Sequence, residues 1–294
     1  MSQSQVWLIT GSSRGLGQQL AQAVLAAGHR LVATARQPQQ LQSLVEQYGE
    51  QVVTVALDVT DAVAAKRAVQ TAIDSFGRLD VVVNNAGYGN IAPVEDADEA
   101  DFRAQVDTNF YGVFNVTRAA LPVLRQQGSG HIIQISTIGA RLGVPGLSAY
   151  HTAKWAVEDF SESLAKEIAP FGVKVTLVEP GGFRTDWAGS SMTIAPVSAA
   201  YQATLGPMLD YLQQHNGHQP GDPAKAAQVI LQIAEMDEPP LRLLLGSDAV
   251  FIAGQVQAER EAADAKFRYL SLSTDRDDSQ ADHETMAALV AGKS

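Results

Sequence analysis

The stretch VWLITGSSRGLG, from Val6 to Gly17, decides the fold because it joins an apolar run to a loop with three glycines. Val6–Thr10 predicts a buried strand, and a helical pattern follows over Gly15–Ala27. Glycine suits the tight turn at Gly11, the approach of backbone to a phosphate at Gly15 and close helix packing at Gly17. The helix N-terminus would offer free N–H groups and a positive dipole end. The stretch therefore predicts a dinucleotide phosphate site, with a purely structural strand–helix turn as the alternative.

Short apolar runs alternate with helical patterns along the rest of the chain. Runs rich in Val, Ile and Leu predict parallel strands buried on both faces, at Val6–Thr10, Leu31–Thr34, Val52–Leu57, Val81–Asn84, His131–Ser136, Val173–Glu179 and Leu241–Leu245. Helices are predicted between them, at Gly15–Ala27, Gln39–Tyr48, Ala62–Phe76, Glu99–Gln127, Ala149–Ala169 and Pro223–Met236. We therefore predict an α/β fold, a single-domain Rossmann-like doubly wound parallel sheet of about seven strands with helices on both faces.

Two segments interrupt this alternation. Residues 186–220 follow the sixth strand, and a loop of this length usually forms a lid over a binding site or is disordered. Residues 247–294 follow the last strand, with a helical pattern over Phe251–Leu270 and a polar end that we expect to be solvated. We predict a nucleotide-binding and catalytic domain over residues 1–246, which includes the 186–220 lid, and a partly helical C-terminal extension over residues 247–294.

Composition excludes several classes of function. The chain has 294 residues and 46% apolar residues, enough for one domain with a substantial core. Its net charge of −11 argues against binding to nucleic acid or an anionic membrane. Cysteine is absent, which excludes disulfides and thiolate catalysis, and His215 and His218 lack a third ligand, so we predict no metal site. The polar N-terminus and the lack of a long apolar run predict a cytoplasmic protein.

The end of the second predicted strand indicates which dinucleotide is bound. An acidic residue there would bind the ribose 2′-hydroxyl of NAD, whereas an arginine accommodates the 2′-phosphate of NADP. Ala35 stands at the position expected for the acid, and Arg36 follows it. Arg36 and Arg14 together offer two forked guanidinium groups to a phosphate dianion. We therefore predict NADP(H), with an Arg36 that merely extends along the surface as the alternative.

Tyr150 and Lys154 stand four residues apart in a helical pattern, so their side chains share one face. A free tyrosine has a pKa near 10, and an ammonium within a few Å favours the phenolate and can lower that pKa by about 1–3 units. Such a phenol can donate a proton to a carbonyl or accept one from an alcohol. The pair follows the fifth predicted strand, whose end carries Ser136 and Thr137.

These features in this order resemble the short-chain dehydrogenase/reductase family over roughly Val6 to Leu245. The resemblance implies catalytic roles for Asn109, Ser136, Tyr150 and Lys154. Ser136 would hydrogen-bond the substrate oxygen, although Thr137 is a rival hydroxyl, and Asn109 would hold a water on a proton route to Lys154. The alternative for Asn109 is a structural amide at a helix kink, since Asn is a poor helix former.

The resemblance also assigns the remaining cofactor contacts. Asn84-Asn85-Ala86-Gly87 would shape the cofactor groove, Asp58 and Val59 would contact the adenine, and Thr185 would bind the nicotinamide carboxamide. Asp58 could equally cap the turn that follows it. The predicted nucleotide residues are Gly11, Ser13, Arg14, Gly15, Leu16, Gly17, Arg36, Asp58, Val59, Asn84, Ala86, Gly87, Tyr150, Lys154, Pro180, Gly181 and Thr185.

The predicted function is NADPH-dependent reduction of the carbonyl of an apolar ketone or aldehyde, or the reverse oxidation. The lid is rich in apolar residues and has no Lys or Arg to bind an anionic substrate. We predict that Val144, Leu147, Trp187 and Met192 contact the substrate. Relatives commonly pair the two helices over Glu99–Gln127 and Ala149–Ala169, so we expect a homodimer, with a homotetramer as an open alternative. The rival functions are a non-catalytic NADP(H)-binding protein and an epimerase or dehydratase that recycles its nicotinamide.

Overall fold

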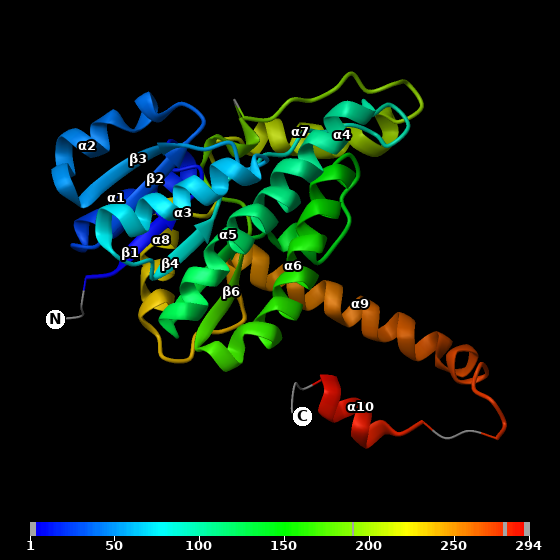
Figure 1. The fold of residues 1–294 in the computed structure, drawn as a ribbon. Coiled ribbons are helices and arrows are strands. Elements are labelled where there is room, and N and C mark those ends of the chain that lie inside the picture. Colours follow the sequence, from blue (N-terminus) through cyan, green and yellow to red (C-terminus); the bar gives the residue numbers. More distant parts are fainter. Residues whose placement is uncertain (1–3, 190, 279–280, 291–294) are drawn as a thin grey trace. The chain divides into compact units, whose positions relative to one another are not determined.

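The computed structural model describes residues 4–189, 191–278 and 281–290 (Figure 1). Part of the polar N-terminus and part of the C-terminal end that we predicted to be solvated therefore lie outside the described residues. The chain divides into two compact units, Met1–Val250 and Phe251–Ser294. The first unit contains a sheet of seven parallel strands in the order β3-β2-β1-β4-β5-β6-β7. The strands are β1 (Val6–Ile9), β2 (Arg30–Ala35), β3 (Val52–Ala56), β4 (Val81–Asn84), β5 (Gly130–Ile135), β6 (Val173–Pro180) and β7 (Arg242–Leu245).

The strand order reverses at the centre of the sheet, where β1 lies between β2 and β4. Leu8 of β1 pairs with Val32 of β2 on one side and with Val82 of β4 on the other. At such a reversal the connections leave toward opposite faces, which opens a crevice beyond the carboxyl ends of the strands. The doubly wound fold with about seven strands is therefore confirmed, and the crevice lies where the glycine loop follows β1.

Helices cover both faces of the sheet (Figure 1). Trp7 and Ile9 belong to one buried cluster and Leu8 to the other, as the alternation of a strand requires. The first cluster includes residues of α1 and α8, and the second includes residues of α3, α5 and α6. The bounds are α1 (Gly15–Ala26), α2 (Gln42–Tyr48), α3 (Ala62–Phe76), α4 (Glu99–Val106), α5 (Gly112–Gln127), α6 (Ser148–Ile168) and α8 (Pro223–Glu235).

The helix predicted over Glu99–Gln127 is interrupted by a turn of π-helix, η3 (Asp107–Tyr111). Asn109 lies in this turn, and its Nδ2 donates a hydrogen bond of 2.8 Å to the carbonyl of Gln105. A side chain that bonds to a backbone carbonyl competes with the regular helical ladder, and π-turns are frequent at functional sites. The prediction of one continuous helix is therefore wrong at this turn.

The insertion over residues 186–220 contains more regular structure than we predicted. It holds a short 3₁₀ turn, η6 (Asp186–Ala188), and a helix, α7 (Gln202–His215). Gly206 and Pro207 both disfavour a helix interior, which hides α7 in the sequence. Leu205 is nevertheless buried and packs with Ile91 and Leu147, so tertiary contacts stabilise the helix.

The C-terminal region also differs from the prediction. The helix α9 (Ser247–Leu272) begins before Phe251, and its first turn belongs to the first unit, which ends at Val250 rather than at residue 246. A second helix, α10 (His283–Val290), lies in the segment that we expected to be irregular. Apolar and polar residues are mixed around α9, so periodicity gave only part of its length. In the described part of the chain, no helix combines the length and apolar character needed to span a bilayer.

Candidate active site

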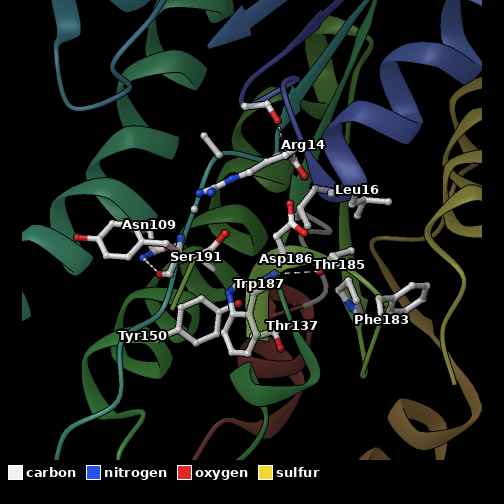
Figure 2. A pocket seen from close by; sticks show the side chains of 18 of the residues that line it. Arg14, Leu16, Asn109, Thr137, Tyr150, Phe183, Thr185, Asp186, Trp187 and Ser191 are labelled. Atoms are coloured by element: carbon white, nitrogen blue, oxygen red, sulfur yellow. Dashed lines mark hydrogen bonds between the residues drawn. The ribbon is translucent and has the colours of Figure 1, made fainter. Parts of the chain in front are cut away.

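A cavity of about 1180 Å³ lies at the carboxyl ends of the central strands. Its walls come from the loop after β1, the end of β2, the segment after β4, the end of β5, α6 and the loop after β6. Figure 2 shows Arg14 and Leu16 at one end of this cavity, with Tyr150 and Trp187 next to each other at the other. The cavity thus joins the two regions that the sequence assigned to nucleotide and substrate.

The glycine loop has the backbone geometry that its sequence predicts. Gly11 and Gly15 have φ of 69° and 55°, values that L-residues with a side chain rarely adopt. A Cβ built on Gly17 would lie 2.2 Å from the carbonyl oxygen of Gly11 and 2.4 Å from Asn85 Nδ2, so helix and loop approach closely there. Asn85 Nδ2 donates to the carbonyls of Thr10 (2.9 Å) and Gly11 (3.1 Å), which fixes the loop against the end of β4.

Most of the predicted nucleotide residues line the cavity, but Asn84 does not. Its Nδ2 donates to Thr117 Oγ1 (3.0 Å) and Gln134 Oε1 (2.8 Å) inside the protein, so the structure does not support its assignment to the nucleotide. The neighbouring Asn85, which the sequence placed in the groove only as part of the motif, lines the cavity instead. Gly17 does not line the cavity, but it packs closely against the loop at Gly11. The predicted residues that do line it are Gly11, Ser13, Arg14, Gly15, Leu16, Arg36, Asp58, Val59, Ala86, Gly87, Tyr150, Lys154, Pro180, Gly181 and Thr185.

Arg14 and Arg36 both line the cavity and both are exposed. Among the described residues, neither guanidinium forms a hydrogen bond or an ion pair with another side chain. Ala35 places no carboxylate beside them. Two available guanidinium groups without a competing acid suit a phosphate dianion.

Tyr150 and Lys154 lie on one face of α6, at the cavity floor. Lys154 Nζ donates a 2.7 Å hydrogen bond to the carbonyl of Ile135 and lies 5.8 Å from the centroid of the Tyr150 ring. Burial lowers the pKa of Lys154 from 10.5 to about 8, and the Glu158 carboxylate partly offsets this change. Burial also raises the pKa of Tyr150, against the net lowering that we expected, because the loss of hydration outweighs every nearby charge or hydrogen bond.

Ser136 and Thr137 are adjacent but point to different surroundings. The Ser136 Oγ is buried without a hydrogen-bond partner among the described residues. It faces Glu158, whose pKa it lowers slightly without forming a hydrogen bond of regular geometry. Ser136 and Thr137 both line the cavity, but the Thr137 hydroxyl is the one that lowers the pKa of Tyr150, against the larger effect of burial. The structure therefore favours Thr137 over the predicted Ser136 as the hydroxyl beside the phenol.

Asn109 lies close to Lys154 without bonding to it. Its Oδ1 accepts a 3.2 Å hydrogen bond from the Tyr88 N–H, and its Nδ2 donates to the Tyr88 carbonyl at 2.8 Å. A Cβ added to Gly87 would lie 2.5 Å from Asn109 Oδ1 and 3.7 Å from Lys154 Nζ, so both atoms border the same small space. The π-turn and Gly87 together bring the amide to this space.

One of the four predicted substrate residues lines the cavity. The Trp187 ring lies 5.1 Å from the Tyr150 ring, centroid to centroid, and Figure 2 shows the two rings side by side. Val144, Leu147 and Met192 do not line the cavity but pack with α7 in an apolar cluster that also includes Trp187, so their direct contact with substrate is not supported. Apolar character in the sequence could not distinguish a residue that lines the cavity from one that packs against a neighbouring helix. The cavity near Trp187 also has polar residues, namely Tyr88, Asn90, Ser191 and Thr193.

The fold and this site define a class of oxidoreductase built on a dinucleotide-binding sheet. Residues 5–193 match the family described as short chain dehydrogenase, and the chain belongs to that family. It is 53% identical over 272 residues to the oxidoreductase BOA17 of Botryotinia fuckeliana, which covers 92% of this chain and 99% of that protein. It is also 36% identical over 249 residues to a 3-ketodihydrosphingosine reductase of Bacteroides thetaiotaomicron, covering 83% of this chain and 88% of the relative.

Solved structures resemble the whole arrangement. A short-chain dehydrogenase from Streptomyces avermitilis superposes with a TM-score of 0.87 at 38% identity, covering 93% of this chain and all of that one (100%). A short chain dehydrogenase from Burkholderia cenocepacia in complex with NADP superposes with a TM-score of 0.71 at 27% identity, covering 90% and 97% of the two chains. The chain is therefore an oxidoreductase of a family that acts on CH–OH or C=O groups.

Proposed function

We propose that this chain is an NADPH-dependent reductase that converts the carbonyl of an apolar ketone or aldehyde into an alcohol, or catalyses the reverse reaction. The observation that carries the proposal is the convergence of Thr137, Tyr150 and Lys154 on one cavity with the glycine loop. A proton donor beside a dinucleotide site is what carbonyl reduction requires.

The residues around the cavity fit NADP(H). Gly11 and Gly15 allow backbone to approach the pyrophosphate, and Arg14 and Arg36 are available for the 2′-phosphate. Asp58 and Val59 line the place for the adenine, and the loop from Pro180 to Thr185 lines the place for the nicotinamide. When bound, the nicotinamide supplies or accepts the hydride. The NADP complex of the Burkholderia relative supports the same choice of nucleotide.

The protein's part in the reaction is to orient the carbonyl and to deliver a proton. Tyr150 donates its phenolic proton to the carbonyl oxygen, and Thr137 hydrogen-bonds the same oxygen. Burial raises the pKa of the phenol, so the protonated form predominates but donates its proton readily only when a nearby positive charge stabilises the phenolate. Lys154 places an ammonium near the phenolate that forms, and Asn109 borders the space through which a proton could return.

The lid supports an uncharged, largely apolar substrate. Trp187 covers the Tyr150 ring, and α7 closes this side of the cavity through Tyr211 and Leu212. Residues 186–220 contain no Lys or Arg, so a carboxylate or phosphate has no cationic partner in the lid. The name of the Bacteroides relative, 3-ketodihydrosphingosine reductase, is consistent with the reduction of a ketone.

The test is NADPH consumption by the purified protein against a panel of aliphatic ketones, β-ketoesters, quinones and steroids. We expect turnover with apolar carbonyl compounds and a loss of at least about a hundredfold in Tyr150→Phe, since a positioned acid contributes about 10²–10⁴-fold. Tyr150→Phe should still bind NADPH, because phenylalanine preserves the shape of the side chain. A Tyr150→Phe protein that retains most of its rate would refute the proton path, and binding of NADPH without any turnover would favour a non-catalytic role.

A further inference from the structure

The first turn of α9 contacts the loop that follows β6, and a carboxylate makes the contact. Asp248 Oδ2 accepts a 2.7 Å hydrogen bond from the Gly182 N–H. The same loop is also held by the end of β7, where the Gly181 N–H donates to the carbonyl of Leu245 at 2.9 Å. On a third side, the Gly221 N–H donates to the carbonyl of Gly182 at 2.9 Å. Asp248 thus adds a side-chain hydrogen bond to the backbone bonds that hold this loop.

The Asp248 carboxylate fills the space that a side chain at residue 181 would need. A Cβ built on Gly181 would lie 2.3 Å from Asp248 Oδ1 and 2.4 Å from Oδ2. The backbone of Gly181 does not have a positive φ, so it would accept alanine on conformational grounds. The three nearest atoms to that Cβ all belong to Asp248. Glycine is therefore needed at residue 181 because of Asp248.

The helix dipole favours an acid in the first turn of α9, but it does not explain why one oxygen of this carboxylate is buried. Asp248 Oδ1 is buried and has no hydrogen-bond partner among the described residues. A buried oxygen without a partner is unfavourable, and more so when it carries charge. Asp248 nevertheless lines the cavity that also contains Pro180, Gly181 and Thr185. The carboxylate therefore lies beside the loop that the nicotinamide half of the cofactor would face.

We propose that Asp248 is a positioning residue for the nicotinamide half of the cofactor. It fixes the backbone of the loop over residues 180–185 by bonding to Gly182 and by packing against Gly181. The first turn of α9 is then part of the cofactor site, although most of that helix belongs to the second unit. This inference rests on the proposed NADP(H) function.

The test separates the two halves of the cofactor by comparing NADPH with 2′,5′-ADP, which lacks the nicotinamide. Isothermal titration calorimetry of Asp248→Ala should show about tenfold weaker NADPH binding, the order expected for the loss of one charged hydrogen bond. The affinity for 2′,5′-ADP should stay within about twofold of the wild type. Asp248→Asn keeps an acceptor oxygen and should restore NADPH binding. Equal losses for both ligands, or no loss for either, would overturn the proposal.

A double-mutant cycle tests the contact with Gly181. Gly181→Ala alone should weaken NADPH binding, whereas Gly181→Ala in the Asp248→Ala background should add little, because the opposing carboxylate is gone. Additive effects would refute the pairing. Asp98→Ala is the matched control, because Asp98 also accepts one backbone hydrogen bond at a helix start, from Asp101 N at 2.8 Å. Wild-type protein that binds neither ligand would instead refute the proposed function.

Discussion

The two hydroxyl residues at the end of β5 both line the cavity, but their hydroxyls have different neighbours. Ser136 is turned toward the buried Glu158, whereas Thr137 is turned toward Tyr150 in the cavity. The family resemblance pointed to Ser136, but neighbouring residues on a strand face opposite sides. Sequence alone could identify the pair and could not choose between its members.

We predict that Thr137→Val lowers kcat/KM by about a hundredfold, because removal of a hydrogen-bond donor to a developing oxyanion typically costs 10²–10³-fold. Thr137→Ser should keep most of the rate, since it also keeps the hydrogen bond that Thr137 Oγ1 accepts from the Gly139 N–H at 3.1 Å. Ser136→Ala is the control and should change the rate by less than about threefold. Steady-state kinetics with one ketone measures kcat/KM for the three variants. A larger loss in Ser136→Ala than in Thr137→Val would assign the hydrogen bond to the substrate oxygen to Ser136.

A second residue-scale prediction concerns nucleotide choice. Arg36→Ala should weaken NADPH binding by about tenfold to a hundredfold, because hydrogen bonds to charged groups are worth about 1.5–3 kcal/mol. Binding of NADH should be almost unchanged, since that nucleotide has no 2′-phosphate for the guanidinium. Fluorescence titration of both nucleotides against both proteins measures this difference. Equal affinity of the wild type for NADPH and NADH would contradict the assignment of Arg14 and Arg36.

At the scale of elements, α6 carries a charged stripe behind the phenol. Tyr150, Lys154, Glu158 and Glu162 follow each other at intervals of four residues along the helix. Glu158 is buried and pairs with Arg242 at 2.8 Å, while Glu162 pairs with the other terminal nitrogen of Arg242 at 2.9 Å. The groups that face Glu158 are Lys154 on its own helix, Ser136 after β5, Arg141, Glu179 of β6 and Arg242 of β7. Burial raises the pKa of Glu158 from 4.5 to about 7.

This stripe predicts a pH dependence. Burial lowers the pKa of Lys154 to about 8, and ionised Glu158 opposes this effect. Glu158→Gln removes that opposition and should lower the pKa of Lys154 further. The alkaline limb of the kcat/KM profile for reduction, which requires the ammonium, should then move to lower pH. Glu162→Gln is the matched control, because Glu162 shares Arg242 but lies two turns from Lys154 and is partly exposed. Identical profiles for wild type and Glu158→Gln would rule out this coupling.

The same carboxyl affects stability in a direction that can be stated in advance. Its pKa is higher in the folded protein than its ordinary value of 4.5, so the folded state binds more protons between about pH 4.5 and about pH 7. The contribution of Glu158 to the free energy of unfolding is therefore present below about pH 4.5 and is lost as the pH rises through about 7. Urea unfolding of wild type and Glu158→Gln at pH 5 and pH 8 measures this effect. The free energy of unfolding of the wild type, relative to that of Glu158→Gln, should be smaller at pH 8 than at pH 5.

The elements also show what sequence patterns can and cannot predict. The strands and the long helices of the first unit were predicted within a few residues, because buried parallel strands and amphipathic helices leave clear periodicities. The π-turn at Asn109 and the helix α7 were not, because each depends on a specific tertiary contact. Asn109 bonds to Gln105 and Tyr88, and Leu205 packs against Ile91. Such contacts override local preference.

At the scale of the whole molecule, the open question is how copies of the first unit associate. The predicted contact uses the region of α4, η3 and α5 together with α6. Tyr111 and Trp155 on these helices are large side chains that are 51% and 42% exposed, while Phe160 packs between Phe110 and Phe114 in edge-to-face contacts and is only partly exposed. Phe160 therefore packs within the protein, and Tyr111 and Trp155 are the residues that would supply the apolar area of the predicted contact.

We predict a homodimer through these helices at micromolar concentration, since a stable interface needs apolar anchors near its centre that lose contact with water. The copies also carry a net charge of −11 each, so an apolar contact must outweigh their repulsion. Tyr111→Lys places a charge in the contact and should shift sedimentation toward the monomer while NADPH binding persists. Phe267→Lys is the matched control, because Phe267 is 48% exposed but belongs to the second unit. A wild-type monomer in analytical ultracentrifugation would refute the prediction, and dissociation by Phe267→Lys instead of Tyr111→Lys would move the interface to α9.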